Sequence, residues 1–259
     1  MRVRRAAALA IVIAGLSVST AFAAGFDDDF NDGVMAPQWS AIIDSPATLL
    51  LNESSGRLNV IASSPPPNSD AIYLSNGSSG FRLSTTSDFD IRVDYSFLAA
   101  TAPGAFNSAV VFGLGRDLDG TDSAAIGYAR GATLIGSLPF AANGLVVAHR
   151  TDDVQTTDLF TLSNADTGTF VLQYHAAGDD LAFGRLGETP LFILNDTVRT
   201  VWGADDLYVS LGGRGQGATI SSGNAWLDNF QIVSGVTVVP EPTTLAAASV
   251  ALIALRRRG

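Results

Sequence analysis

Acidic side chains are the residues of this 259-residue chain best suited to chemistry. Asp117, Asp119 and Asp122 lie close together around a turn glycine, Gly120. Carboxylate oxygens at such spacing are ligands that Ca²⁺ prefers, although the segment is shorter than an EF-hand loop and lacks its closing glutamate. We therefore predict a structural calcium site here, with an ordinary acidic hairpin turn as the alternative.

Glycoside hydrolysis would need two positioned carboxyl groups, one protonated and one ionised. Between residues 24 and 236 the only glutamates are Glu53 and Glu188, which are far apart in sequence and each beside turn-forming residues. Asp90 and Asp94 share a face of one predicted strand, but it is opposite the apolar face, so we expect solvent-facing side chains. We predict no catalytic residue and no enzymatic activity.

Other catalytic residue types are scarce. The chain has no cysteine and no lysine, which excludes thiolate, disulfide and Schiff-base chemistry. His149 and His175 are too few for a three-histidine zinc site, and no Gly-x-Ser-x-Gly motif is present. The glycine-rich segment 212–217 has no following helix to bind a phosphate, so we predict a flexible hairpin loop.

Aromatic side chains could stack against sugar rings. Trp226 lies in an apolar strand, and we expect it to be in the core. Trp202 lies between Val201 and Gly203 in a loop-like segment, which favours exposure. We therefore predict Trp202 and Tyr128 as carbohydrate-binding residues.

The elements that must position these residues are strands. In residues 88–97, the apolar side chains Phe89, Ile91, Val93, Tyr95 and Phe97 alternate strictly with polar ones, which predicts a half-buried antiparallel strand. Many similar short segments follow, punctuated by turn residues, and no long helical period occurs between them. The sequence predicts an all-β antiparallel sandwich over residues 24–236.

The N-terminus has the pattern of a secretory signal peptide over residues 1–23. Arg2, Arg4 and Arg5 precede an apolar stretch, and Ala21 and Ala23 supply the small residues that a signal peptidase requires. We expect cleavage after Ala23 and export of the remaining chain.

The C-terminal segment 237–259 has three parts. Pro240, Glu241 and Pro242 form a turn, residues 245–255 are apolar, and Arg256, Arg257 and Arg258 follow. The apolar part is shorter than the roughly 20 residues of a membrane-spanning helix. The arginines would stay on the cytoplasmic side.

This layout resembles the PEP-CTERM sorting signal of Gram-negative bacteria. The resemblance implies transient insertion of a short transmembrane segment in the inner membrane, followed by processing by an exosortase-type transpeptidase. The implied destination is the cell surface or the extracellular matrix.

The two ends of the predicted domain carry a second resemblance. The acidic segment 26–33, Trp39, the segment 55–60 and the closing segment 225–230 are similar to concanavalin A-like lectin/glucanase domains. The resemblance implies a jelly-roll sandwich in which the first and last strands pair. It also implies a structural calcium ion held by Asp28, Asp29 and Asp228.

The charge of the predicted domain limits its partners. With nine arginines against twenty-four acidic residues, it carries a net charge of −15. Such a surface repels nucleic acid and anionic lipid, whereas neutral polysaccharide is compatible with it. We predict a non-catalytic, lectin-like domain associated with extracellular polysaccharide. A structural matrix protein without a small ligand and a glycoside-active enzyme are the alternatives.

Overall fold

The computed structural model describes residues 25–66, 69–100, 108–132, 142–215, 217–234 and 238–240. In these residues every regular element is a strand, and no helix is long and apolar enough to cross a membrane. The predicted signal peptide and most of the predicted sorting signal lie outside the described residues. These include Ala21, Ala23, Glu241, Pro242, Arg256, Arg257 and Arg258.

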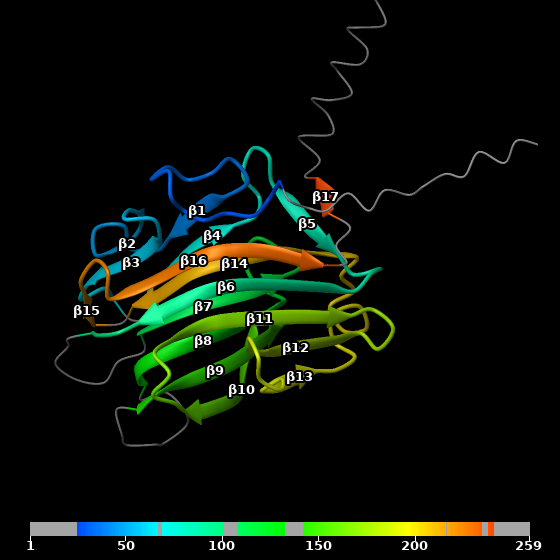
Figure 1. Ribbon diagram of the computed structural model, residues 1–259. Coiled ribbons are helices and arrows are strands. Elements are labelled where there is room, and N and C mark those ends of the chain that lie inside the picture. The colour runs from blue at the N-terminus through cyan, green and yellow to red at the C-terminus, as the bar shows by residue number, and fades with distance from the viewer. Residues whose placement is uncertain are drawn as a thin grey trace, which may run out of the picture.

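Two antiparallel sheets pack face to face as the layers of a sandwich (Figure 1), which confirms the predicted fold class. The nine-stranded sheet has the order β1 (Ser40–Ile43), β4 (Ser69–Leu74), β14 (Asp206–Gly215), β7 (Ser108–Gly115), β8 (Ser123–Ala132), β9 (Ala142–Thr151) and β10 (Val154–Leu162), with β5 (Phe81–Ser84) on β14 and β17 (Val238–Pro240) on β5. The eight-stranded sheet has the order β13 (Phe192–Leu194), β12 (Asp180–Arg185), β11 (Thr167–His175), β6 (Phe89–Phe97), β16 (Ala225–Ser234), β3 (Leu58–Ser63) and β15 (Thr219–Ile220), with β2 (Leu49–Glu53) on β3.

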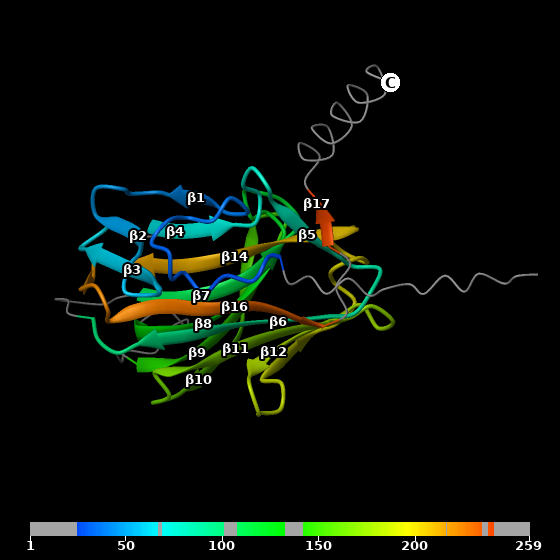
Figure 2. The same cartoon turned by 45° about the horizontal axis from the view of Figure 1, so that its top comes forward.

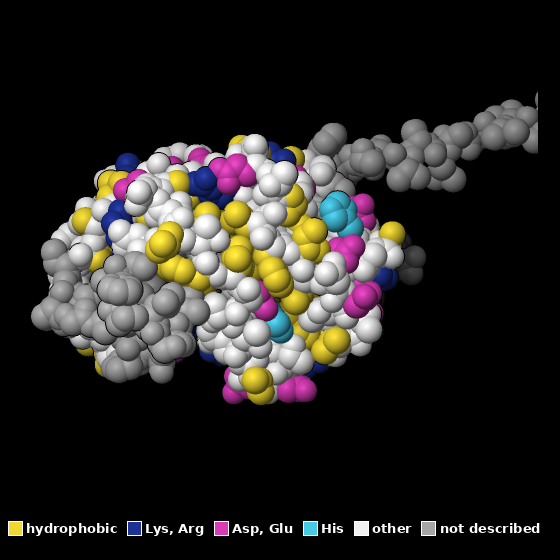
Figure 3. Space-filling view, turned by 90° about the horizontal axis from the view of Figure 1, so that it is seen from below, with side chains coloured by type: hydrophobic (Ala, Val, Ile, Leu, Met, Phe, Trp, Pro, Cys, Tyr) yellow, Lys and Arg dark blue, Asp and Glu magenta, His cyan; other side chains and the backbone are white. Residues whose placement is uncertain are grey.

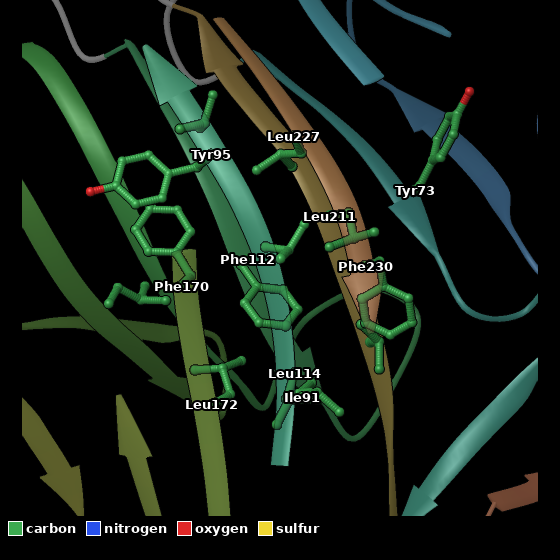
Figure 4. Packing of buried hydrophobic residues seen from close by; sticks show 14 of the residues in the cluster. Tyr73, Ile91, Tyr95, Phe112, Leu114, Phe170, Leu172, Leu211, Leu227 and Phe230 are labelled. Atoms are coloured by element: carbon green, nitrogen blue, oxygen red, sulfur yellow. The ribbon is translucent and has the colours of Figure 1, made fainter. Parts of the chain in front are cut away.

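The core lies between the sheets and is formed by alternate residues of each strand. All five predicted inward residues of β6, from Phe89 to Phe97, are at most 3% exposed. Figure 4 shows Tyr95 of β6 beside Phe170 of β11, and their rings stack with centroids 3.8 Å apart. Burial of each such ring contributes about 1.5–3 kcal/mol to folding. The period-two pattern of β6 therefore fixes which of its faces is left for other functions.

Both ends of the described chain lie against β5. At the N-terminal end, Asp28 forms an isolated antiparallel bridge with Phe230 of β16, which confirms the implied pairing of the first and last segments. The ring of Phe26 packs against that of Phe81 on β5, with the two ring centroids 4.6 Å apart. At the other end, β17 pairs with β5 so that Pro240 is opposite Phe81 (Figure 2).

Gly212 lies in the middle of β14, where neighbouring strands approach closely. The segment 212–217 was predicted to be a flexible loop, but Gly212 to Gly215 belong to β14, so this prediction was wrong. A Cβ atom at Gly212 would lie 2.1 Å from the carbonyl oxygen of Ala71, which is backbone and cannot move aside alone.

Replacing Gly212 with alanine is therefore expected to lower the free energy of unfolding by about 1–3 kcal/mol, because the added methyl group overpacks the sheet. Gly25→Ala is the matched control, since a Cβ atom there meets nothing within 4 Å. Denaturant titration would measure both variants, and an equal effect at the two positions would contradict the close approach.

Candidate functional site

The carboxylates of the first predicted calcium set are engaged by protein groups around their turn. Asp122 is buried, accepts the backbone N–H of Asp152 at 2.9 Å and pairs with Arg116 at 2.9 Å. Asp117 accepts the backbone N–H of Thr121, while Asp119 accepts its hydroxyl. The three carboxylates thus shape the turn between β7 and β8, as the alternative of an acidic hairpin turn proposed.

The second predicted set is also engaged by other protein groups. Asp28 accepts the Nε1–H of Trp39 at 2.7 Å. Burial raises the pKa of Asp228, and the nearby carboxylates of Asp94 and Asp29 raise it further. Among the described residues, no three histidine or acidic side chains are gathered so that they could hold a metal ion.

Trp202 and Tyr128 do not present ring faces to solvent. Trp202 is 1% exposed, and its Nε1–H donates to the hydroxyl of Thr151 at 3.0 Å. Tyr128 is fully buried and donates to the carbonyl of Ser163 at 2.9 Å. The expected exposure of Trp202 was wrong because residues 197–204 form a hydrogen-bonded turn, in which Trp202 N and Val201 N both donate to Thr197 O. This turn directs the indole into the core.

Trp226 is the tryptophan that lies outside the core. Its strand neighbours Ala225 and Leu227 are fully buried, so Trp226 points to the outer face of the eight-stranded sheet and is only partly covered. The guanidinium of Arg57 lies 4.7 Å from the ring centroid, which is a cation–π contact. The prediction of a core position for Trp226 was therefore wrong.

A network of planar polar side chains occupies the same outer face. Arg92 on β6 donates to Asp90 from Nε at 2.9 Å and from Nη2 at 2.7 Å. Gln173 on β11 donates to the same carboxylate at 2.9 Å, because Asp90 and Gln173 are direct cross-strand partners. Asp90 is consequently only 8% exposed rather than freely solvated as predicted. Each member of the network is held in one orientation by the others.

A hollow of about 210 Å³ lies beside this network. Its floor carries the small or apolar residues Val171, Ala182 and Gly184. Its wall is the turn between β12 and β13, which folds back over the sheet, and there Arg185 pairs with Glu188 through two hydrogen bonds. The polar side chains that reach the hollow from the outer face are therefore Arg92 and Gln173, whereas Arg185, the cross-strand partner of the core residue Phe170, lies at its rim with Glu188.

Asp94 continues the polar surface toward Trp226. It accepts the hydroxyl of Thr169 at 2.5 Å and the Nδ2–H of Asn229 at 2.9 Å. Asn229 has a φ of 49° and lies where the pairing of β16 with β6 shifts register, between Asp228 and Gln231. A bulge of this kind redirects a side chain, and here it brings the amide to the carboxylate.

The outer face of the nine-stranded sheet is different in character. Cross-strand partners form a row of apolar residues and glycines from β1 to β10. These are Ile42, Ile72, Gly212, Val111, Gly127, Val146 and Phe160. The adjacent row from β4 to β10 consists of Leu74, Ser210, Gly113, Ala125, Ala148 and Thr157. Neither row contains a carboxylate, so neither supplies the acid and base of a glycosidase.

Glu53 is an ionisable group whose burial the sequence did not predict. Residue Glu53 on β2 is 9% exposed, and neither carboxyl oxygen has a hydrogen-bond partner of normal geometry among the described residues. Burial raises the pKa of Glu53 to about 7, and the charges of Asp28 and Asp32 add to the effect, while the nearby hydroxyl of Tyr73 opposes it. Its signal in the sequence, a lone glutamate at a strand end, is too weak to predict burial.

The side chain of His175 is 58% exposed, whereas that of His149 is 20% exposed. Figure 3 shows both next to acidic side chains, on a face that also exposes apolar side chains. His149 pairs with Asp158 at 2.8 Å, where the pairing of β10 with β9 shifts register. His175 lies 3.8 Å from Asp88. The His149–Asp158 pair links β9 and β10, and the His175–Asp88 pair links β11 to the loop that precedes β6.

The comparison with solved structures finds sandwiches of the concanavalin A-like lectin/glucanase type. A laminarinase from Flavobacterium sp. aligns with a TM-score of 0.53 at 10% identity, over 81% of this chain and 99% of that one. A glycoside hydrolase family protein from Mycobacterium thermorestibile aligns at 0.47 and 15% identity, over 83% and 99%. Lectin II from Ulex europaeus aligns at 0.49 and 12% identity, over 82% and 97%. No protein-family model and no curated protein sequence matches the chain.

These neighbours bear on two predictions. The concanavalin A-like type of sandwich, first indicated by residues at the two ends of the domain, is confirmed. The prediction that the chain is not an enzyme is corrected, because the same fold is found in a laminarinase. The low identity limits this likeness to the fold.

Proposed function

We propose that this chain is an exported protein whose sandwich binds a neutral polysaccharide in the hollow over β6, β11 and β12. The observation that supports the proposal most strongly is the pairing of planar polar side chains around an apolar floor. Sugar hydroxyls act as donors and acceptors at once, and Arg92, Asp90 and Gln173 offer both functions in a fixed arrangement.

The charge of the molecule favours a neutral ligand. Each arginine at the hollow is paired with a carboxylate, Arg92 with Asp90 and Arg185 with Glu188. The site therefore offers no excess positive charge to an acidic sugar. The surrounding domain, at a net charge of −15, would repel an acidic polymer.

Export and sorting are part of the proposal and are supported by the terminal segments of the sequence. The signal peptide over residues 1–23 would be cleaved by signal peptidase. The segment 237–259 would hold the protein briefly in the inner membrane until an exosortase-type transpeptidase processes it. The product would reach the cell surface or extracellular matrix, where polysaccharide is the available ligand.

A pull-down with a panel of insoluble neutral polysaccharides tests the binding site. Gln173→Ala is expected to weaken binding about tenfold, which corresponds to one good hydrogen-bonding group. Gln155→Ala, on the exposed edge strand β10, is the matched control and should bind as the unchanged protein does. Equal retention of both variants would place the binding site elsewhere.

Glycoside hydrolysis is the second candidate function, favoured by the fold of the laminarinase. Glu188 lines the hollow, and Asp90 lies beneath Arg92 at its border. Release of soluble sugar from the same panel, measured for the unchanged protein and for Glu188→Gln and Asp90→Asn, decides this question. Release that survives both substitutions would exclude these carboxyl groups as its source.

A further inference from the structure

We infer that the outer face of the eight-stranded sheet takes an extended oligosaccharide rather than a single sugar, with Trp226 forming a second subsite at a distance from the hollow. The inference rests on the proposed function, because it assigns the class of ligand for that same face. It starts from the position of Trp226, whose ring is neither buried in the core nor freely mobile.

Trp226 is the cross-strand partner of Ser96 and Asn59, which are both buried, while part of its own surface stays open. Trp39 and Trp202 are buried, and each donates its Nε1–H to a protein oxygen. Trp226 instead remains partly open on a polar face, where a large apolar ring is costly to hydrate. The guanidinium of Arg57 lies over one face of the ring, 4.7 Å from its centroid, so it restricts the ring and a sugar would stack on the other face with little loss of side-chain entropy.

The strand register links Trp226 to the hollow without interruption. Trp226 is paired with Ser96 of β6, and the next outward residue along β6, Asp94, is paired with both Asp228 and Thr169. The following outward residue is Arg92, at the hollow. The outward-facing residues Ser96, Asp94 and Arg92 of β6 therefore form a continuous row from Trp226 to the hollow.

The separation exceeds what one sugar ring can span. Four residues along β6, from Ser96 to Arg92, correspond to about 13 Å. A chain lying along this track would meet the Asp94, Thr169 and Asn229 group between its two ends. These groups hydrogen-bond one another and present planar oxygen and nitrogen atoms suited to sugar hydroxyls.

The charge along the track again indicates a neutral chain. Burial raises the pKa of Asp228, the carboxylates of Asp94 and Asp29 raise it further, and the guanidinium of Arg57 lowers it. Uronic acid or sulfate groups placed here would add to this repulsion. The inferred ligand is therefore a neutral, linear oligosaccharide that spans the face.

Calorimetric titration with a length series, from disaccharide to hexasaccharide, of the polysaccharide retained in the pull-down tests the inference. For the unchanged protein, affinity should rise with length by at least tenfold. Trp226→Ala should remove this gain in affinity with length, while its affinity for the disaccharide stays within twofold of that of the unchanged protein. Trp226→Phe should keep most of the gain. Gln173→Ala should weaken every length.

Each contrary result has a distinct meaning. Disaccharide and hexasaccharide binding of equal strength would overturn the second subsite and leave the proposed function intact. A uniform loss of affinity in Trp226→Ala would also overturn it, since the ring would then act through the hollow. Absence of binding by the unchanged protein to every glycan would overturn the proposed function and the inference together. Unfolding curves for each variant verify that the sandwich is intact.

Discussion

Replacing Asp179 with alanine is expected to lower the free energy of unfolding by about 3–5 kcal/mol. The carboxylate of Asp179 is buried and accepts the hydroxyl of Tyr174 at 2.8 Å. It also accepts the backbone N–H groups of Arg199 and Thr200 at 2.9 and 3.0 Å. Burial alone would raise the pKa of Asp179, but these hydrogen bonds outweigh it and hold the pKa below its ordinary value. Alanine would leave three donors without an acceptor.

The backbone of Asp179 adds to this effect. Its φ is 53°, in the left-handed region that alanine adopts reluctantly and asparagine tolerates. Asp179→Asn should therefore lose less stability than Asp179→Ala. Denaturant unfolding followed by tryptophan fluorescence would measure both. Asp205→Ala, at an exposed position, is the control and should change stability by less than about 0.5 kcal/mol. A similarly small effect of Asp179→Ala would contradict its role as an acceptor for three donors.

Glu53 should make the stability of the sandwich depend on pH. Its folded-state pKa of about 7 lies above the ordinary value of 4.5, so the folded protein holds this proton more tightly than the unfolded chain does. Stability should therefore fall as pH rises from about 4.5 to about 7, and this loss should be complete above that range. One pKa unit corresponds to about 1.4 kcal/mol, which gives a total cost of at most about 3 kcal/mol.

Glu53→Gln removes the ionisation while keeping the shape of the side chain. The stability of this variant should not fall between about pH 4.5 and 7 through ionisation at residue 53. The variant should therefore be more stable than the unchanged protein at pH 8. Glu188→Gln, whose carboxyl group is 43% exposed, is the matched control and should follow the unchanged protein. Parallel curves for Glu53→Gln and the unchanged protein between pH 5 and 7 would show that the carboxyl group titrates normally in the folded state.

Much of the architecture could be predicted from the sequence because it depends on local period. The pairing of the first and last segments was implied by the resemblance to concanavalin A-like domains. The alternation of residues 89–97, by contrast, identified both the strand and its buried face from signals in the segment itself. These signals are contained within a few neighbouring residues. They do not require knowledge of which strands lie side by side.

The candidate site could not be predicted in the same way, because cross-strand register creates it. Asp90 and Gln173 are 83 residues apart in sequence, and only their pairing across β6 and β11 brings them into contact. The glycine-rich segment that begins at Gly212 gave a loop signal, whereas close packing of strands is what its glycines allow. The neighbours of Trp202 and Trp226 in the sequence predicted the reverse of the observed exposure. A hydrogen-bonded turn buries Trp202, and the alternation of β16 places Trp226 on the outer face.

The position of the two chain ends on β5 has a consequence for protein engineering. Phe26 packs on Phe81, and Pro240 is paired with the same residue, so the ends of the described sandwich are neighbours. A short linker from residue 240 to residue 25 could close the chain into a ring without crossing either outer face. New ends could then be opened in an exposed turn such as residues 152–153, between β9 and β10. The sandwich is thus a natural scaffold for circular permutation or for insertion into a loop of another protein.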